Sequence, residues 1–89
     1  MNSVAKRKVT LRIMGHDYAL VTDQPEEKVQ RIARYVDRQM RELAIMTRAA
    51  EGMVPILTCM TLTEELMELQ GENNMLRRTL EQRGIRQDT

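Results

Sequence analysis

The sequence predicts an α+β protein in which a small N-terminal β-hairpin and an amphipathic helix form a head, followed by a long C-terminal coiled-coil helix. Three patterns support this prediction. Near the N-terminus, apolar and polar residues alternate with the period of a half-buried strand. Further along, apolar residues recur every three or four positions over about six turns of helix. In the last third of the chain, leucines recur at alternating spacings of three and four, which is typical of a coiled coil.

The composition limits the chain to one small domain that needs a partner. The chain has 89 residues, a net charge of +1 and two aromatic side chains, Tyr18 and Tyr35. The part that remains beside a long helix is too small to be stable alone, so we expect self-association. The near-neutral charge and the lack of an aromatic platform for stacking bases both argue against nucleic acid as a partner.

The cellular compartment is predicted from the same composition. Cys59 is the only cysteine, so no disulfide forms within the chain, and a lone cysteine suits a reducing compartment. No apolar run approaches the roughly 18–20 residues of a membrane span. The basic residues at the start of the sequence are not followed by the apolar segment of a signal peptide. We therefore expect a cytoplasmic protein with no membrane contact.

The sequence is expected to divide into a flexible N-terminal tail at 1–7, an α/β head at 8–50, a coiled-coil oligomerisation helix at 51–84 and a C-terminal tail at 85–89. In the head, the first strand has three apolar residues on one face: Val9, Leu11 and Ile13. Turn residues at 15–17 interrupt this pattern, and extended character resumes over 18–22, so a β-hairpin is predicted. A single hairpin is marginal in water, so it must lie against a helix or pair with another copy.

A helix start is predicted just after the hairpin. Asp23 can cap the helix, Glu26 follows three residues later, and Pro25 falls in the first turn, where its missing N–H costs little. The helix that follows carries an apolar stripe made of Val29, Ile32, Ala33, Val36, Met40 and Leu43. Residues 49–52 end this helix or join it to the next, which opens between Gly52 and Pro55.

The second helix carries a seam at heptad spacing, made of Cys59, Leu62, Leu66, Leu69, Asn73, Leu76 and Leu80. Gly71 and Asn74 face away from the seam; the glycine costs ~1 kcal/mol of helix propensity but spoils no packing. Asn73 lies in the seam, where it either fixes register and chain number or marks a weak spot. Apolar residues off the seam, such as Met60 and Met67, indicate burial on a second side, either by the head or by dimers packing on dimers.

The whole outline resembles the ZapA family of bacterial cell-division proteins, the ring-associated partners of the tubulin-like FtsZ. The resemblance runs from about Val9 to Arg83 and rests on three stretches in order: "LRIMGHDY", "PEEKVQRIARYVDRQMREL" and "ILTCMTLTEELMELQ". It implies a head that pairs in a dimer, a C-terminal coiled coil, and dimers associating into a tetramer. It also implies a function without chemistry, in which FtsZ protofilaments are bound and bundled at the midcell division ring.

No catalytic, metal or cofactor site is predicted. His16-Asp17 is an adjacent pair in a turn, with no third group implied nearby, and a solvated loop histidine is the simpler interpretation. One His and one Cys cannot supply the usual four ligands of a structural metal. No glycine-rich phosphate loop is present.

Arginines mark a candidate contact surface on the first helix. Four of them lie at helical spacing opposite the apolar stripe, and a fifth lies further round the same side: Arg31, Arg34, Arg38, Arg41 and Arg48. They form either an ordinary solvated face or a cationic contact surface, for which an acidic protein filament fits better than nucleic acid. The resemblance implies FtsZ as that filament. The alternative function is a coiled-coil dimerisation adaptor for another protein partner.

Overall fold

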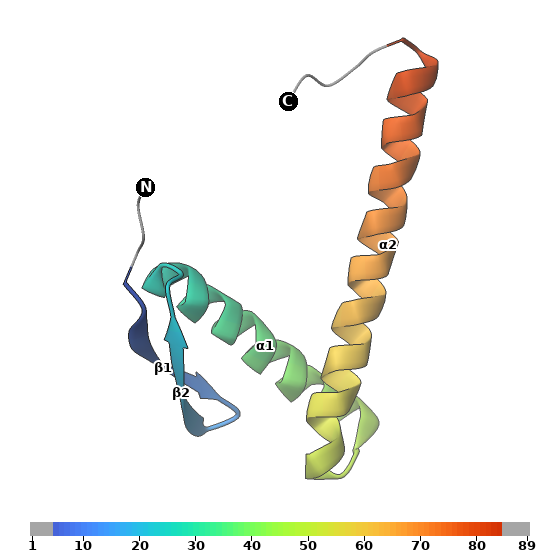
Figure 1. The fold of residues 1–89 in the computed structure, drawn as a ribbon. Helices are drawn as coiled ribbons and strands as arrows, with labels where there is room; N and C mark the ends of the chain where they lie inside the picture. The colour runs from blue at the N-terminus through green and yellow to red at the C-terminus, as the bar shows by residue number, and fades with distance from the viewer. Residues whose placement is uncertain (1–4, 85–89) are drawn as a thin grey trace. The chain divides into compact units, whose positions relative to one another are not determined.

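The computed structural model describes residues 5–84. It contains strands β1 (Arg7–Ile13) and β2 (His16–Thr22), helix α1 (Glu26–Thr47), a 3₁₀ turn (Glu51–Met53) and helix α2 (Val54–Gln82), as Figure 1 shows. This order confirms the predicted α+β class, with an antiparallel hairpin, an amphipathic helix and a long C-terminal helix. Strand β1 begins one residue before the predicted head. The predicted C-terminal tail at 85–89 and positions 1–4 of the predicted N-terminal tail lie outside the described residues.

The chain divides into two compact units, with the boundary between Thr58 and Cys59. The first unit holds the hairpin, α1, the 3₁₀ turn and the first residues of α2. The second unit consists of the remainder of α2, which stays helical through Gly71 as far as Gln82. A methyl group added at Gly71 would meet only open space in the single chain.

The hairpin turn is tighter than predicted. Ile13 pairs directly with His16, so the turn consists of Met14 and Gly15 alone. Both residues have positive φ, 53° for Met14 and 78° for Gly15. Such a two-residue turn suits the right-handed twist of the strands. The prediction of a turn over Gly15-His16-Asp17 was therefore wrong at two positions, because His16 and Asp17 take their places in β2.

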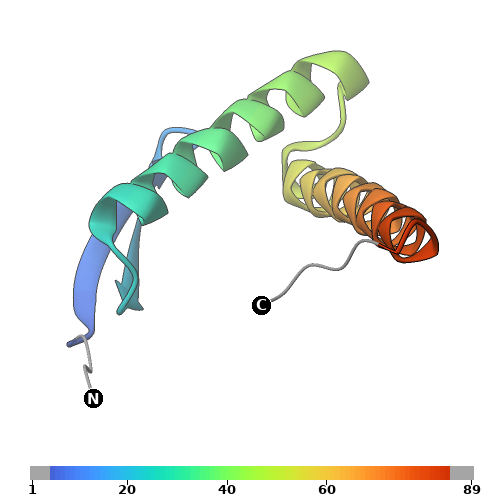
Figure 2. The ribbon, with the colours of Figure 1, turned by 90° about the horizontal axis from the view of Figure 1, so that it is seen from above.

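Helix α1 packs on β1 through a small aliphatic core. Figures 1 and 2 both show α1 lying alongside the hairpin. Val9 is 2% exposed, and Val29 and Ala33 of α1 are also buried. The register places Leu20 opposite Val9 and Tyr18 opposite Leu11, on the same side of the sheet. Both β2 side chains are nevertheless exposed, since α1 contacts β1 and leaves the apolar side of β2 open.

Only part of the predicted apolar stripe is buried. Val29 and Ala33 are buried, and Val36, Met40 and Leu43 are half-buried, as the stripe requires. Ile32 is 53% exposed, so this member of the apolar stripe is not buried in the single chain. Ile32 lies at the edge of the stripe, beyond the width of α1 that β1 covers.

The start of α1 also differs from the prediction. The helix begins at Glu26, and Pro25 occupies the N-cap position with extended ψ (137°) and no side-chain cap. Asp23 therefore does not cap the helix. The backbone carbonyl of Pro25 instead accepts a hydrogen bond from the Val29 N–H at 3.1 Å, and Glu26 and Glu27 supply favourable negative charge to the first turn.

The junction between the helices falls where the sequence predicts it. Helix α1 ends at Thr47, and Arg48 adopts the left-handed conformation (φ 53°) that often follows a helix. Helix α2 begins at Val54, so Pro55 lies in the first turn, where a missing N–H breaks no helical hydrogen bond. Val54 and Thr58 are buried, and the Thr58 hydroxyl donates to the Val54 carbonyl at 2.8 Å.

The importance of the Val9 contact is testable with an isosteric change. Val9→Thr keeps the shape and β-branching but buries a hydroxyl in the small core, and we expect a loss of about 1–3 kcal/mol of unfolding free energy. Val21→Thr is the matched control, because Val21 lies in the same hairpin but is 65% exposed. Urea unfolding followed by circular dichroism measures both variants. Equal loss from the two would contradict a core centred on Val9.

Candidate functional site: the arginine face of α1 and the seam of α2

Four arginines recur at spacings of three and four along α1. Arg31, Arg34, Arg38 and Arg41, here called the arginine face, are all exposed. Their helical spacing and exposure agree with the prediction that they share a solvent-facing side. Arg48 differs, because it follows the end of the helix in the left-handed conformation. The helical-wheel argument that grouped it with the others does not apply to it, and its part in a contact stays a prediction.

Arg38 is oriented by an aromatic ring. Its guanidinium carbon lies 5.4 Å from the centroid of the Tyr35 ring, within the range of a cation–π interaction. Tyr35 is itself exposed. A ring restrains the guanidinium without neutralising it, so Arg38 keeps its full positive charge toward solvent.

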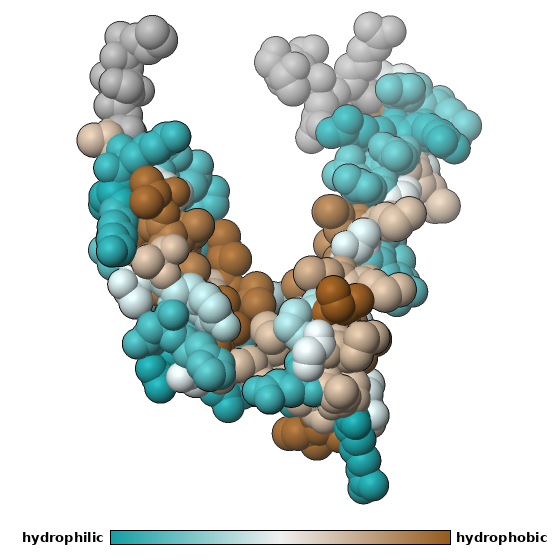
Figure 3. Space-filling view, turned by 60° about the horizontal axis from the view of Figure 1, so that its bottom comes forward, coloured by the Kyte–Doolittle hydropathy of each residue, from teal (hydrophilic) through white to brown (hydrophobic). Residues whose placement is uncertain are grey.

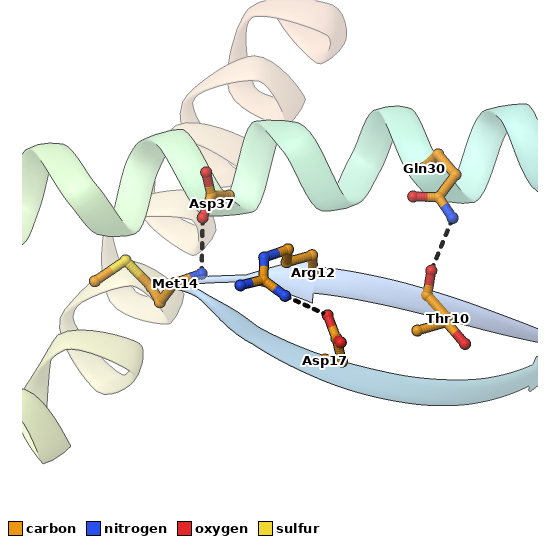
Figure 4. Close-up of polar contacts among 6 residues, drawn as sticks. All are labelled: Thr10, Arg12, Met14, Asp17, Gln30 and Asp37. Atoms are coloured by element: carbon orange, nitrogen blue, oxygen red, sulfur yellow. Dashed lines mark hydrogen bonds and ion pairs between the residues drawn. The ribbon is translucent and has the colours of Figure 1, made fainter.

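Arg41 is paired with a carboxylate. Its Nε lies 2.9 Å from Oδ2 of Asp37, four residues earlier on α1. The other carboxylate oxygen of Asp37, Oδ1, accepts a hydrogen bond at 2.7 Å from the backbone N–H of Met14 in the hairpin turn (Figure 4). The hydrogen bond from Arg41 lowers the pKa of Asp37 below its ordinary value, and the Met14 N–H lowers it further. Asp37 thus joins the turn to the arginine face.

A second polar link runs between α1 and β1. The Gln30 side-chain amide donates to the backbone carbonyl of Thr10 at 2.9 Å (Figure 4). Asp37 and Gln30 therefore hold the helix to the hairpin at two separated points. Sequence reasoning missed both links. The spacing of Asp37 and Arg41 was a visible signal for an ion pair, but no pattern in the sequence shows that a backbone group of the turn is the other partner.

The hairpin carries its own ion pair on exposed side chains. Arg12 and Asp17 are directly opposite each other in the register, and Nη1 of Arg12 lies 2.9 Å from Oδ1 of Asp17 (Figure 4). An exposed pair of this kind contributes little stability. His16, the first residue of β2, precedes Asp17 in the chain and is exposed.

The predicted seam lies on one continuous helix, and most of it is exposed. Leu62 and Leu80 are half-buried, whereas Cys59, Leu66, Leu69, Asn73 and Leu76 are exposed. Leu69, near the middle of the seam, is 63% exposed. Figure 3 shows apolar side chains exposed on both units of the chain. Leucines repeated on a solvent-exposed helix are typical of a surface that another chain covers. The seam itself stays a prediction.

Residues 5–84 hold no group of three or more His, Cys, Asp or Glu side chains placed to bind a metal ion. Among the same residues, neither helix combines the length and the apolar character that crossing a membrane requires.

The hairpin, the charged helix and the long leucine-bearing helix define a class of small α+β proteins built from a head and an extended C-terminal helix. A family model described as cell division protein ZapA matches residues 9–87. The chain belongs to the ZapA family of cell division proteins.

Relatives agree with this assignment over nearly the full length. The chain is 30% identical over 91 residues to the cell division protein ZapA of Geobacillus kaustophilus (strain HTA426), covering 99% of this chain and 100% of the relative. It is 25% identical over 81 residues to the ZapA of Bacillus mycoides (strain KBAB4), covering 90% and 91%. Among solved structures, the ZapA mutant dimer from Geobacillus stearothermophilus is similar, with a TM-score of 0.70, 27% identity, and coverage of 91% of this chain and 95% of that chain.

The Asp37 link makes stability depend on pH in a defined direction. Because its pKa is lowered in the folded protein, ionised Asp37 stabilises the fold above the unfolded value of roughly 3.9, and this contribution is lost as pH falls through the lower folded pKa. We expect Asp37→Asn to be less stable than wild type near pH 7 and the difference to shrink below about pH 3.9. Urea unfolding of both proteins from pH 7 to pH 2 measures this difference in unfolding free energy.

Asp23→Asn serves as the control for this prediction. Asp23 is exposed, and its carboxylate accepts no hydrogen bond from any residue in 5–84. A constant difference between Asp37→Asn and wild type from pH 7 to pH 2 would contradict the role of the ionised carboxylate.

Proposed function

We propose that this chain is a non-enzymatic protein that binds FtsZ and cross-links or bundles its protofilaments, promoting assembly of the Z-ring. It would act in the cytoplasm, at the midcell division ring. The observation that carries the proposal is the arginine face, a set of four exposed cationic side chains at helical spacing on α1. Membership of a cell division family supports the same interpretation.

The contact would be electrostatic. Arginine side chains present several N–H donors in a fixed plane that matches carboxylates, and an acidic filament surface supplies carboxylates in repeated positions. Exposed charges are screened by salt, with a Debye length of about 8 Å at 0.15 M ionic strength. One arginine face therefore gives a weak and salt-sensitive contact.

Cross-linking requires several such faces in one assembly. We propose that the seam of α2 joins chains into a dimer, and that apolar residues off the seam, Ile56, Met60 and Met67, pack dimers into a tetramer. All three are exposed in the single chain, and the similar Geobacillus structure is a dimer. Helix α2 has 29 residues, which spans about 44 Å at 1.5 Å per residue. Linked sites can raise avidity by ~10²–10⁴ where the geometry allows simultaneous engagement.

The alternative is a coiled-coil adaptor for another protein partner. It would use the same seam but would not need the arginine face. Cosedimentation of the full chain with GTP-assembled FtsZ discriminates between the two, because an adaptor for another protein would stay in the supernatant.

Reversing charge on the arginine face tests the proposed contact. Arg34→Glu/Arg38→Glu leaves the core and the seam unchanged, so folding and oligomer size should survive. Binding should not, because two attractions become repulsions. At 0.05 M salt, we expect that the double variant no longer pellets with FtsZ filaments and that the turbidity due to bundles is lost. Wild-type bundling should itself weaken between low and moderate salt.

Lys6→Glu/Arg78→Glu is the matched control for this experiment. It changes the net charge by the same amount at two exposed positions away from the arginine face. Undiminished bundling by a correctly assembled Arg34→Glu/Arg38→Glu protein would move the contact elsewhere, with the hairpin around Arg12 and His16 as the next surface to test.

The seam is tested separately by Leu69→Glu. If a second chain covers Leu69, the substitution buries an unpaired charge, which costs several kcal/mol, and the oligomer should dissociate at micromolar concentration. Asn74→Glu adds the same charge on an outward position of the same helix and should leave the oligomer intact. Light scattering measures the mass of each variant. A full-size oligomer for Leu69→Glu would refute the seam assignment.

A further inference from the structure

The arginine face is not uniform, because one of its members already has a partner. Arg41 is held at 2.9 Å by Asp37, while Arg31, Arg34 and Arg38 form no ion pair with any acidic side chain within residues 5–84. Glu27 and Glu42 stand four residues from Arg31 and Arg38, a spacing that permits pairing, yet neither pair is formed. Three arginines thus present uncompensated charge, and the fourth does not.

The carboxylate that holds Arg41 is fully engaged. One oxygen of Asp37 accepts from Arg41 and the other from the Met14 N–H at 2.7 Å. Met14 is a non-glycine residue with positive φ, a conformation that needs support from its surroundings. Asp37 supplies that support from α1, and its side chain is only 25% exposed. If Arg41 turned outward to a filament, it would leave an ionised carboxylate unpaired beside an acidic surface.

We propose that Asp37 and Arg41 form a positioning pair that anchors the hairpin turn, and that contact with the acidic filament is made by Arg31, Arg34 and Arg38 without Arg41. This inference rests on the proposed function of the arginine face. Arg38 is the best placed of the three, because Tyr35 orients its guanidinium while leaving its charge free. The arginine face therefore consists of a contact part and an anchoring part on the same side of one helix.

Two charge-matched variants separate this inference from a simple effect of net charge. Arg38→Gln and Arg41→Gln each remove one positive charge from the same helix. If only the total charge matters, both weaken FtsZ binding equally. If the positioning pair is correct, Arg38→Gln weakens binding on the order of tenfold, as expected for loss of one charged hydrogen bond, whereas Arg41→Gln removes no contact and weakens binding clearly less, through the unpaired charge that it leaves on Asp37.

Each variant is measured by cosedimentation with GTP-assembled FtsZ over a range of salt concentrations. Arg38→Gln should flatten the salt dependence of binding by more than Arg41→Gln does, a difference that a purely structural role of Arg38 would not produce. Hydrogen exchange of the Met14 amide reports the anchor directly. It should accelerate in Asp37→Ala and stay at the wild-type rate in Arg38→Gln.

The outcomes distinguish this inference from the proposed function beneath it. Equal weakening by Arg38→Gln and Arg41→Gln, with wild type still binding FtsZ, overturns the division of the arginine face and leaves the proposed function standing. Unchanged binding by both variants also overturns the inference, because the contact then lies elsewhere. Absence of FtsZ binding by wild type overturns the proposed function and this inference together. Unchanged Met14 exchange in Asp37→Ala overturns the anchor.

Discussion

The head depends on one contact, the packing of α1 against β1. Val9 of β1 and Val29 and Ala33 of α1 are the residues of these two elements that are buried, and the two elements are in contact. The two polar links, from Asp37 to the turn and from Gln30 to Thr10, join the same two elements. Strand β2 is attached chiefly through its ladder with β1. Because an isolated hairpin is marginal in water, the helix is what keeps the hairpin folded.

The same contact determines what the chain leaves exposed. Since α1 covers β1, the apolar side chains of Tyr18 and Leu20 on β2 and of Ile32 on α1 remain open to solvent. The buried core holds only a few aliphatic side chains, too few to stabilise an 89-residue chain comfortably. Further apolar surface must therefore be removed from water, and an exposed leucine seam on α2 offers another place for this. Stability and self-association are in this sense one physical requirement.

The elements that follow from periodicity were predictable from the sequence. The first strand, the amphipathic helix and the long second helix are correctly predicted, because alternation and helical spacing directly reflect which sides are buried. The errors lie at the hairpin turn and at the start of α1, where the backbone conformation of single residues sets the boundary of an element. The turn moved to Met14-Gly15 because strand pairing continued through His16, and α1 began after Pro25 because that residue kept an extended ψ.

The arginines of the candidate site could be predicted from the sequence, but the contacts that each of them makes could not. Helical spacing places four arginines on one side, and the structure agrees. Spacing does not reveal that Asp37 reaches a backbone N–H in the turn, because that contact depends on how α1 lies over the hairpin. It also does not reveal that Arg48 leaves the helix. Pairwise contacts between distant segments are tertiary information, and a single-sequence pattern carries almost none of it.

The placement of charge would allow a fold this small to carry the proposed contact surface. Aligned cations on one helix repel each other, and burying any of them would add a desolvation cost. Placing them opposite the packed side of α1 keeps them hydrated, so the repulsion is screened and folding is not penalised. Screening equally weakens each contact with a partner, so a single chain would hold a filament only loosely. Strength must then come from the number of linked faces rather than from any one of them. In such an assembly, single contacts would dissociate readily while the assembly as a whole stayed bound. Filaments that are cross-linked in this way could still move relative to one another.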